Sequence, residues 1–201
     1  MGESHRLYVM ILALSYGYGF TIMFAYYEHY TIKDYDLWEG HWELLNGMPY
    51  AMSPSPTVSH QLIAGNILTQ FNTAIRRQGN GCTPCYALME VDWEVSHDTI
   101  VKPDILILCD EIDERVIKTP HIIFEVSSPS TAKRDELLKF QLYEKEGVAY
   151  YVLVYPENKL AKVYHWINGA YQKQGDYSTG KLTFDVKNCH VLLDFSAIWR
   201  K

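Results

Sequence analysis

Two short apolar runs within residues 102–127 constrain the fold of this chain more than any other feature. The runs cover residues 105–109 and 122–124, are rich in aliphatic side chains, and are bounded by proline or by charged residues. Segments of this length and composition are typical of strands buried on both faces of a sheet. Asp104 directly precedes the first run, and Glu125 directly follows the second. The sequence therefore predicts two buried strands that carry one carboxylate each.

These two carboxylates are costly in buried strands unless something compensates their charge. For either one alone, the ordinary explanation is a turn or capping role for Asp104 and a salt bridge for Glu125. Two carboxylates that converge from neighbouring strands form instead a suitable site for a hard cation such as Mg²⁺, which prefers oxygen ligands. The pair, taken with the residues that follow it, favours a metal site.

The size and composition of the chain indicate one folded globular domain without a broad basic surface. The chain has 201 residues, of which 48% are hydrophobic and 21% are charged, and this is enough for a substantial core. The formal net charge of −6 excludes a global basic field that would attract nucleic acid. Any nucleic-acid site must therefore be a local groove.

The apolar N-terminal segment stands apart from this domain. Residues 7–27 contain no charge over 21 positions, which is just long enough to cross a bilayer as a helix. Three explanations fit: a weak signal anchor, an apolar helix docked on the domain, or an over-extended start with translation beginning at Met23. The third is preferred because the domain pattern begins only near Tyr30. We therefore expect an apolar extension over 1–29, a single domain over 30–201, no membrane association and a cytoplasmic location.

The four cysteines do not form a clear zinc or redox motif. Cys82 and Cys85 make a lone CxxC pair, whereas Cys109 and Cys189 lie far away in sequence. A zinc site requires a second Cys or His pair at matching spacing, and a redox site requires a thioredoxin-like context. We therefore expect ordinary loop cysteines, with Cys109 in the core.

Periodic patterns elsewhere predict an α/β fold with a mixed sheet. Asn46-Gly47 lies between apolar residues and is a strong hairpin signal. The expected helices cover residues 31–38, 58–77, 132–146 and 195–199. The other expected strands are the hairpin over 41–52 and single strands over 85–95, 149–155 and 189–193, with a meander between the last two that ends near residue 177. Apolar strands around a crossover helix allow parallel pairing beside antiparallel pairing, so the sheet should be mixed.

Glu43 and His60 are further candidates for the site. Glu43 lies in the middle of a hairpin strand, and His60 lies near the start of the helix over 58–77, on its apolar face. A core histidine with a satisfied hydrogen bond is the ordinary explanation for His60. Because the helix should begin near the strand ends, His60 could instead reach the carboxylate pair.

Lys139 is the candidate cation. It shares one face of the helix over 132–146 with Asp135 and Tyr143, and this face borders an apolar stripe made by Leu138 and Leu142. If the stripe packs on the sheet, the long stem of Lys139 can run along it to deliver the ammonium. The ordinary alternative is a solvated ion pair with Asp135.

An ordered series of motifs resembles a known family. Pro103-Asp104 is followed by Glu125-Val126-Ser127, by Ser-Pro-Ser-Thr, and then by Asp-x3-Lys-x3-Tyr-x3-Gly-Val. Upstream stand Trp-Glu-Leu-Leu-Asn-Gly, Ser-Pro-Ser-Pro and His60. Over residues 30–200 this series resembles the Uma-two family of restriction endonucleases, a bacterial branch of the PD-(D/E)xK nuclease superfamily.

The resemblance implies a restriction-endonuclease-like core, with a mixed β-sheet flanked by helices and followed by a C-terminal β-meander. It implies Asp104 and Glu125 as metal ligands, to which the Val126 carbonyl could add, and an auxiliary Glu43. The expected cation is Mg²⁺, with Mn²⁺ able to substitute, and no small-molecule cofactor is expected. The expected partner is DNA, with a homodimer plausible because double-strand cutting commonly pairs two sites.

One position departs from the superfamily pattern. That pattern has a lysine two residues after the glutamate, and here the residue is Ser127. Within the family a lysine on the next helix takes the role, which corresponds to Lys139. The expected activity is metal-dependent hydrolysis of DNA phosphodiester bonds, with Lys139 near the attacking water and His60 near the phosphate. The alternative is a catalytically silent nucleic-acid- or protein-binding module, favoured by Ser127 and by the acidic net charge.

Overall fold

The computed structural model describes residues 6–16, 19–52, 55–78, 82, 84–128, 132 and 134–200, with side chains described from Tyr27 onward. The chain divides into two compact units, where the sequence predicts one domain after an extension. The first unit comprises Met1–Met52 and Glu94–Val101, and the second comprises Ser53–Trp93 and Lys102–Lys201. Each unit has its own sheet structure and is described by itself.

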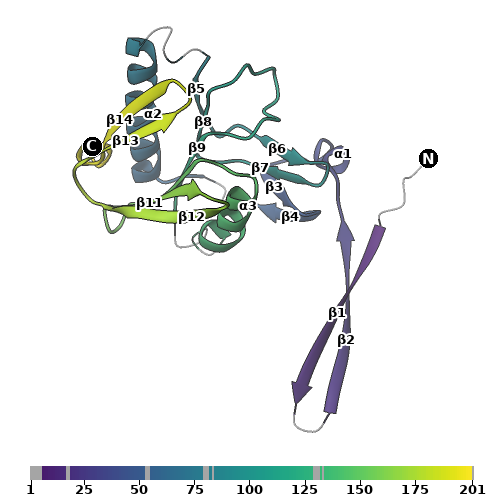
Figure 1. The fold of residues 1–201 in the computed structure, drawn as a ribbon. Helices are drawn as coiled ribbons and strands as arrows, with labels where there is room; N and C mark the ends of the chain where they lie inside the picture. Colours follow the sequence, from purple (N-terminus) through teal and green to yellow (C-terminus); the bar gives the residue numbers. More distant parts are fainter. Residues whose placement is uncertain are drawn as a thin grey trace. The chain divides into compact units, whose positions relative to one another are not determined.

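The first unit begins with a long antiparallel hairpin. Strand β1 (Arg6–Tyr16) pairs with β2 (Gly19–His29) along its whole length (Figure 1). The apolar segment is therefore extended, in contrast to the docked or spanning helix that its composition allows. No α-helix in the described part of the chain has both the length and the apolar character needed to cross a bilayer.

The rest of the first unit matches its local sequence signals. At the start of α1 (Ile32–Tyr35) the Thr31 backbone N–H donates to the Asp34 side chain, which is the reciprocal half of a capping box, and the Thr31 hydroxyl donates to the same oxygen. Strands β3 (Trp42–Leu45) and β4 (Met48–Ala51) form the expected hairpin, with Asn46 and Gly47 both at positive φ. The hairpin belongs to a four-stranded sheet in the order β4-β3-β7-β6.

The expected strand over 85–95 is wrong, because the chain breaks between two separate strands. Strand β5 (Tyr86–Met89) belongs to the sheet of the second unit, whereas β6 (Trp93–Ser96) pairs in the four-stranded sheet. Glu90 adopts a φ of 50° between them, which no regular strand contains. Strand β7 (Thr99–Val101) was not predicted from the sequence and is fully buried.

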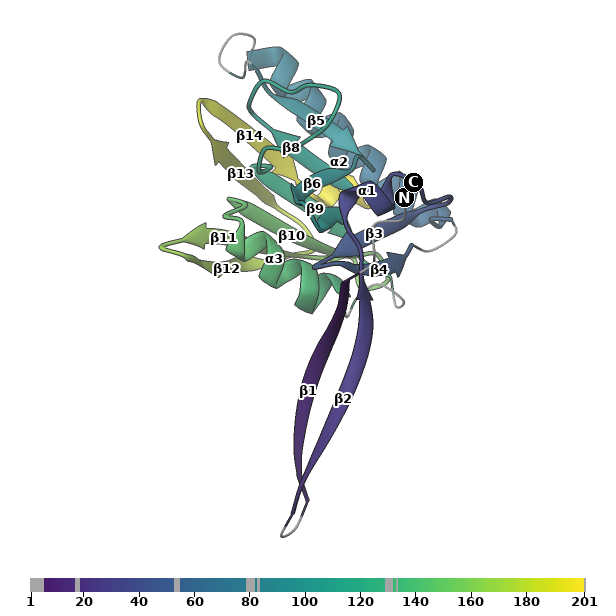
Figure 2. The same cartoon turned by 90° about the vertical axis from the view of Figure 1, so that its right-hand side faces the viewer.

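The second unit is built on a six-stranded mixed sheet in the order β12-β11-β10-β9-β8-β5 (Figures 1 and 2). Its remaining strands are β8 (Ile105–Leu108), β9 (Ile122–Val126), β10 (Tyr150–Tyr155), β11 (Leu160–Ile167) and β12 (Ala170–Tyr177). β9 and β10 pair in parallel, and the other neighbours pair antiparallel. Both central apolar runs are strands with every residue buried, as the sequence predicts.

One face of this sheet packs on α2 (Val58–Gln78). The helix buries Ile63, Ala64, Ile67 and Phe71 against alternate residues of the strands, and each large apolar side chain contributes about 1.5–3 kcal/mol. The same core takes in the hairpin of β13 (Lys181–Val186) and β14 (Cys189–Asp194) with α4 (Phe195–Ile198).

The opposite face is covered by a helical segment that is rotated relative to the sequence prediction. Arg134–Lys139 is a π-helix that continues as α3 (Phe140–Lys145), and Gly147 ends the segment at a φ of 72°. Leu138 is 42% exposed, so the expected Leu138/Leu142 stripe does not pack on the sheet. The inward face is polar instead, because Lys139 forms a buried ion pair with a carboxylate of β9.

The cysteine prediction is also wrong, because all four cysteines are paired. Cys82 bonds to Cys189, and Cys85 bonds to Cys109. Cys85 and Cys109 flank paired ends of β5 and β8, where Tyr86 faces Leu108, so the fold brings the two sulfurs together. Cys109 does lie in the core, as expected. Sequence spacing gave no sign of these pairings, since the partners are 107 and 24 residues apart.

Candidate active site

The two carboxylates lie at neighbouring positions on one face of the second unit's sheet. Antiparallel pairing sets Ile105 opposite Phe124, so the same register sets Asp104 opposite Glu125. Ile105 and Phe124 both point into the core beneath α2. Because side chains alternate along a strand, Asp104 and Glu125 belong to the other face. This is the adjacency that the sequence predicts for the pair.

Asp104 is held by two contacts at the start of β8. Its Oδ2 accepts a hydrogen bond of 2.6 Å from the Val126 backbone N–H, on the neighbouring strand. The same oxygen lies 3.1 Å from Nε2 of His60. The Asp104 side chain remains 18% exposed, so the carboxylate is fixed in place and still accessible from solvent.

His60 contacts the carboxylate pair through Asp104, which decides between the two explanations of this residue. It lies in the first turn of α2, and its Nδ1 is buried without a hydrogen-bond partner among the described residues. Burial lowers its pKa, but the hydrogen bond and negative charge of Asp104, aided by Glu90 and Asp135, outweigh that effect and leave the pKa raised. Next to Asp104 the imidazole is therefore biased toward its charged form.

Glu125 is buried and accepts two hydrogen bonds on the same oxygen. Lys139 Nζ lies 2.9 Å from Glu125 Oε1, and the Tyr143 hydroxyl donates to it at 2.9 Å. Lys139 also lies 4.0 Å from Asp135 Oδ1, and the Lys139 and Asp135 side chains are 2% and 3% exposed. The Asp135–Lys139 pair is thus internal, which excludes the alternative of a solvated pair, and Lys139 points inward to Glu125 as expected.

Electrostatics make this cluster a candidate cation site. Asp104, Glu125 and Asp135 bring three carboxylates to one region, compensated by Lys139 and by His60 when it is protonated. Within the described residues no group of three or more His, Cys, Asp and Glu side chains is close enough to form a complete ligand set. Mg²⁺ commonly binds through one or two carboxylates and keeps several waters, so two carboxylate donors fit such an ion.

Aromatic residues pack against the side chains that contact Glu125 and Asp135. Tyr143 stacks on Trp93, with ring centroids 5.9 Å apart, and meets Tyr151 edge-on at 5.0 Å. The Tyr151 hydroxyl donates to the Asp135 carbonyl at 3.0 Å. Asp135 and Tyr143 were predicted only to share the helix face of Lys139, and Trp93 had no predicted role. The spacing of Asp135, Lys139 and Tyr143 was the available signal, but it did not predict that Tyr143 donates to Glu125.

Two further residues complete the account of the predicted site. Ser127, at the position of the superfamily lysine, is 6% exposed, and its backbone N–H donates to the Val154 carbonyl at 2.8 Å. Glu43 lies on β3 in the first unit, where it faces Tyr50 of β4 and is fully buried. Its part in the chemistry stays a prediction.

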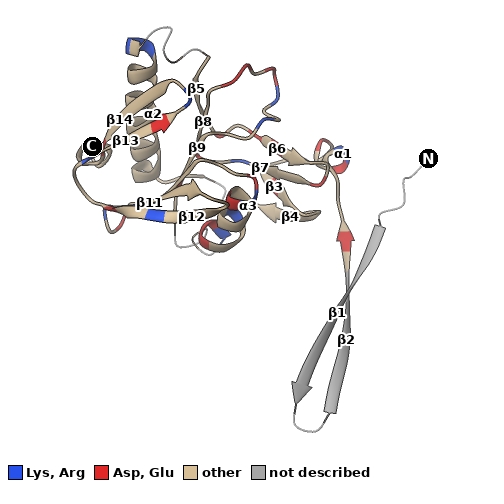
Figure 3. Cartoon of the chain, viewed as in Figure 1, with Lys and Arg blue, Asp and Glu red and all other residues tan. Residues whose placement is uncertain are grey.

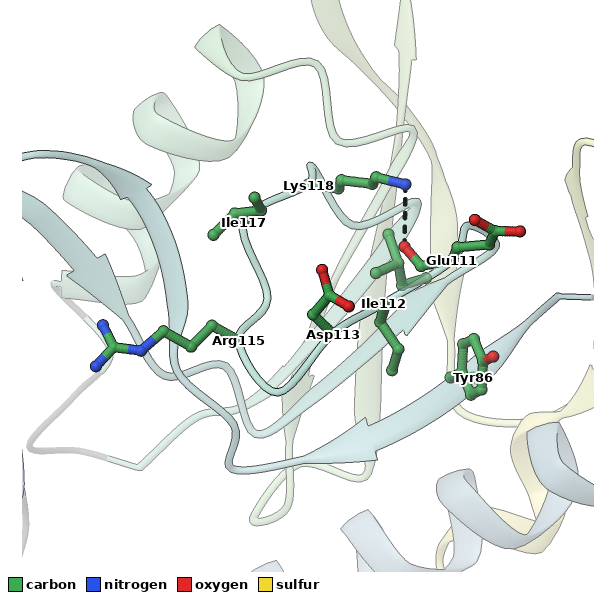
Figure 4. A pocket seen from close by; sticks show the side chains of 8 residues that line it. Tyr86, Glu111, Ile112, Asp113, Arg115, Ile117 and Lys118 are labelled. Carbon is green, nitrogen blue, oxygen red and sulfur yellow. Dashed lines mark hydrogen bonds between the residues drawn. The ribbon is translucent and has the colours of Figure 1, made fainter.

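One cavity of the described residues lies at the other end of β8 from Asp104. A cavity of about 360 Å³ is lined by Tyr86, Leu108 and the loop that follows β8 (Figure 4). Lys118 donates to the Glu111 carbonyl across its rim at 3.0 Å. Asp104 precedes the start of β8 whereas Leu108 ends it, so this cavity and the carboxylate cluster are separate features.

A family model matches most of the chain. The family model "Uma2: Putative restriction endonuclease" matches residues 28–185. The chain belongs to the Uma2 family. The ordered motifs around Asp104, Glu125 and Lys139 all fall inside the matched range.

The fold of this Uma2 protein is also found in a solved structure. The crystal structure described as "a putative nuclease belonging to DUF820" from Anabaena variabilis superposes with a TM-score of 0.66 at 16% sequence identity. The match covers 85% of this chain and 97% of the other. At this identity the likeness establishes the fold, a restriction-endonuclease-like α/β architecture. No curated protein matches the chain.

Proposed function

We propose that this protein is a metal-dependent endonuclease that hydrolyses phosphodiester bonds of DNA. The observation that carries the proposal is the pairing of Asp104 with Glu125 across β8 and β9, with Lys139 buried against Glu125. A buried ammonium beside a carboxylate pair is costly to build, and the same groups suit catalysis at a phosphate. The family's description and the nuclease fold point the same way.

The metal would be Mg²⁺, with Mn²⁺ as a substitute, held by Asp104, Glu125 and the Val126 carbonyl. When bound, such an ion polarises the phosphate and lowers the pKa of a coordinated water. The hydrogen bond from Val126 N–H fixes Asp104, and Tyr143 fixes Glu125, so both ligands are oriented before an ion arrives.

Lys139 and His60 supply the remaining charge in this proposal. Lys139 orients the attacking water and offsets negative charge as the phosphorus is attacked. His60, whose pKa is raised beside Asp104, contacts the phosphate as a cation or gives a proton to the leaving oxygen. Glu43 would act as an auxiliary carboxylate for ligation or orientation.

DNA as the substrate follows from the family resemblance, and the cytoplasm remains the compartment expected from the sequence. Acidic and basic residues are mixed along the loop after β8 and around α3 (Figure 3), so contacts with the DNA backbone would come from local side chains. A homodimer would allow two such sites to cut both strands.

The experiment that tests this function compares Asp104→Asn with Asp176→Asn. Plasmid, single-stranded and branched DNA are incubated with each protein and Mg²⁺ or Mn²⁺, and Mn²⁺ binding is measured by calorimetry. We expect Asp104→Asn to lose cleavage and Mn²⁺ binding, whereas Asp176, an exposed residue of β12 paired with Lys173, can be changed without effect. Cleavage by Asp104→Asn at the wild-type rate would exclude the mechanism.

The second candidate is a catalytically silent module that binds nucleic acid or protein and keeps the nuclease fold. Ser127 in place of the superfamily lysine favours it, as does the net charge of −6. The same calorimetry discriminates the two functions. Wild-type protein that binds DNA but takes up no Mn²⁺ supports the silent module.

A further inference from the structure

Ser127 carries a buried hydroxyl without a partner in the part of the chain that the structure describes. The residue is 6% exposed, and its Oγ has no hydrogen-bond partner among the described residues. Its backbone is satisfied, because the N–H donates to the Val154 carbonyl at 2.8 Å. Buried hydroxyls are nearly always hydrogen-bonded in native proteins, and an unsatisfied one costs free energy. Such a group in a candidate active site calls for a ligand as its partner.

The direction of the Ser127 side chain follows from the strand. Phe124 and Val126 lie in the core beneath α2. The hydrogen bond from Ser127 to Val154 continues the pairing of β9 with β10 one residue past the last strand residue. Side chains alternate along an extended strand, so Ser127 points to the same face as Glu125, about 6.6 Å further along. The free hydroxyl therefore faces the side of the sheet that holds the carboxylate pair.

The neighbouring side-chain donors have partners within the fold. Lys139 and Tyr143 both donate to Glu125 Oε1, and Tyr151 donates to the Asp135 carbonyl. These bonds position the ligands of the site, although the Lys139 ammonium keeps further N–H groups for the attacking water. The Ser127 hydroxyl has no partner among the described residues, so it can donate to a group that enters the site from outside.

We infer that Ser127 is a catalytic residue that donates a hydrogen bond to a non-bridging oxygen of the scissile phosphate. The inference rests on the proposed phosphodiesterase function and names a phosphate contact within it. In the reaction, the water oxygen bonds to phosphorus and the water gives up a proton to solvent. One ester bond breaks with its electron pair staying on the leaving oxygen, which takes up a proton from His60 or from solvent. Ser127 keeps its own proton throughout and stabilises the charge that develops on the phosphate.

Two substitutions separate this role from a structural one. Ser127→Ala removes the donor, and Ser127→Cys keeps a weak donor of similar shape. Exposed Ser178 in the same unit gives the matched control Ser178→Ala. We expect Ser127→Ala to lower kcat for Mn²⁺-dependent cleavage about 100-fold, as for loss of one transition-state donor, with an intermediate value for Ser127→Cys. Mn²⁺ affinity should stay at the wild-type value and Tm should not fall, because the hydroxyl has no partner among the described residues and its removal costs no hydrogen bond.

A sulfur-substituted substrate tests the contact itself. Oligonucleotides with one non-bridging oxygen of the scissile phosphate replaced by sulfur, as separate stereoisomers, are cleaved by wild type and by Ser127→Ala. Sulfur is a weak acceptor, so the defect of Ser127→Ala should shrink at least tenfold for one stereoisomer and persist for the other.

The outcomes distinguish this inference from the function on which it rests. If Asp104→Asn is inactive while Ser127→Ala cleaves at the wild-type rate, the endonuclease function stands and the role of Ser127 is overturned. A Ser127→Ala protein with a lowered Tm and an unchanged kcat also overturns it, in favour of a structural hydroxyl. If wild type cleaves no DNA, both the function and the inference fail.

Discussion

At the scale of single residues, the site depends on how one buried carboxylate is compensated. Glu125 receives two donors on one oxygen, Lys139 and Tyr143, and all three side chains are almost inaccessible to solvent. Removing one partner of a buried ion pair is far more damaging than the pair is stabilising, because the other charge stays buried. Changes to the two donors should therefore separate charge effects from hydrogen-bond effects.

The charge effect is tested by Lys139→Ala. We expect cleavage to be abolished, with kcat at least about 100-fold lower, because the cation near the attacking water is lost. Mn²⁺ binding, measured by calorimetry, should stay largely intact because both ligand carboxylates remain. Without metal, the free energy of unfolding should fall by about 3–5 kcal/mol. Lys145→Ala, on the exposed side of α3, is the control and should cleave at the wild-type rate. If Lys139→Ala cleaves DNA at the wild-type rate, Lys139 has no part in the mechanism.

The hydrogen-bond effect is tested by Tyr143→Phe. The phenyl ring keeps the stacking on Trp93 and lacks the hydroxyl that donates to Glu125. A hydrogen bond to a charged group contributes about 1.5–3 kcal/mol, so urea unfolding should show a loss of that size with an unchanged m-value. Tyr86→Phe, at a half-exposed position of β5, should be neutral. A neutral Tyr143→Phe would mean that Lys139 alone holds Glu125.

At the scale of elements, the start of β9 carries a histidine that makes folding sensitive to pH. His121 Nδ1 accepts a hydrogen bond of 3.2 Å from the Cys109 backbone N–H, at the end of β8. Burial, and secondarily the charge of Lys187, lower the pKa of His121. Protonation would remove the acceptor and place a charge in the interior, so this junction between β8 and β9 favours neutral histidine.

This junction predicts a stability loss on the acidic side. The folded pKa of His121 lies below its unfolded value of about 6.5, so its contribution is complete above that pH. Stability is lost as pH falls from there toward the folded pKa, because the unfolded chain binds the proton more readily. His121→Asn keeps a hydrogen-bond acceptor and does not titrate. The unfolding free energy of the wild type should therefore fall relative to that of the variant as pH drops below about 6.5, and the difference should stay constant above about pH 7.5. A difference that is flat from pH 5 to pH 8 would contradict the prediction.

At the scale of the whole molecule, the two disulfides join segments that are far apart in sequence. Cys82–Cys189 ties the segment after α2 to the first residue of β14, and Cys85–Cys109 joins the ends of β5 and β8. Disulfides persist in oxidising compartments and are rare in the cytosol, so this pairing opposes the cytoplasmic location that the proposed function favours. Counting free thiols on protein isolated under alkylating conditions tests whether the two disulfides form in the cell.

The Cys82–Cys189 disulfide, which closes the longer loop, should stabilise the second unit. Closing a loop with a sequence separation of 107 residues stabilises the fold by about 4–5 kcal/mol in the chain-entropy model. We expect Cys82→Ser/Cys189→Ser to lower the unfolding free energy by this order in non-reducing buffer, and to match the wild type once both are reduced. Four alkylatable thiols in the native protein would instead show that the bonds do not form in the cell.

Local patterns in the sequence determined the elements and the carboxylate pair. The helix over 58–77, the Asn46-Gly47 hairpin and the two buried strands follow from periodicity and turn chemistry, which act between near neighbours. Asp104 and Glu125 could be singled out because charge next to a buried strand is rare and needs compensation. The mixed sheet and the nuclease-like fold could be predicted from the order of these elements and the family resemblance.

Only the tertiary structure decided which side chains meet. The helical segment before Gly147 directs Lys139 and Tyr143 inward and leaves Leu138 exposed. Leaving the buried Glu125 carboxylate without donors would cost more free energy than leaving one leucine exposed. The cysteine pairs and the break at Glu90 likewise depend on which strands become neighbours. These outcomes follow from contacts between residues distant in sequence, and no local pattern encodes which distant group will compensate a buried charge.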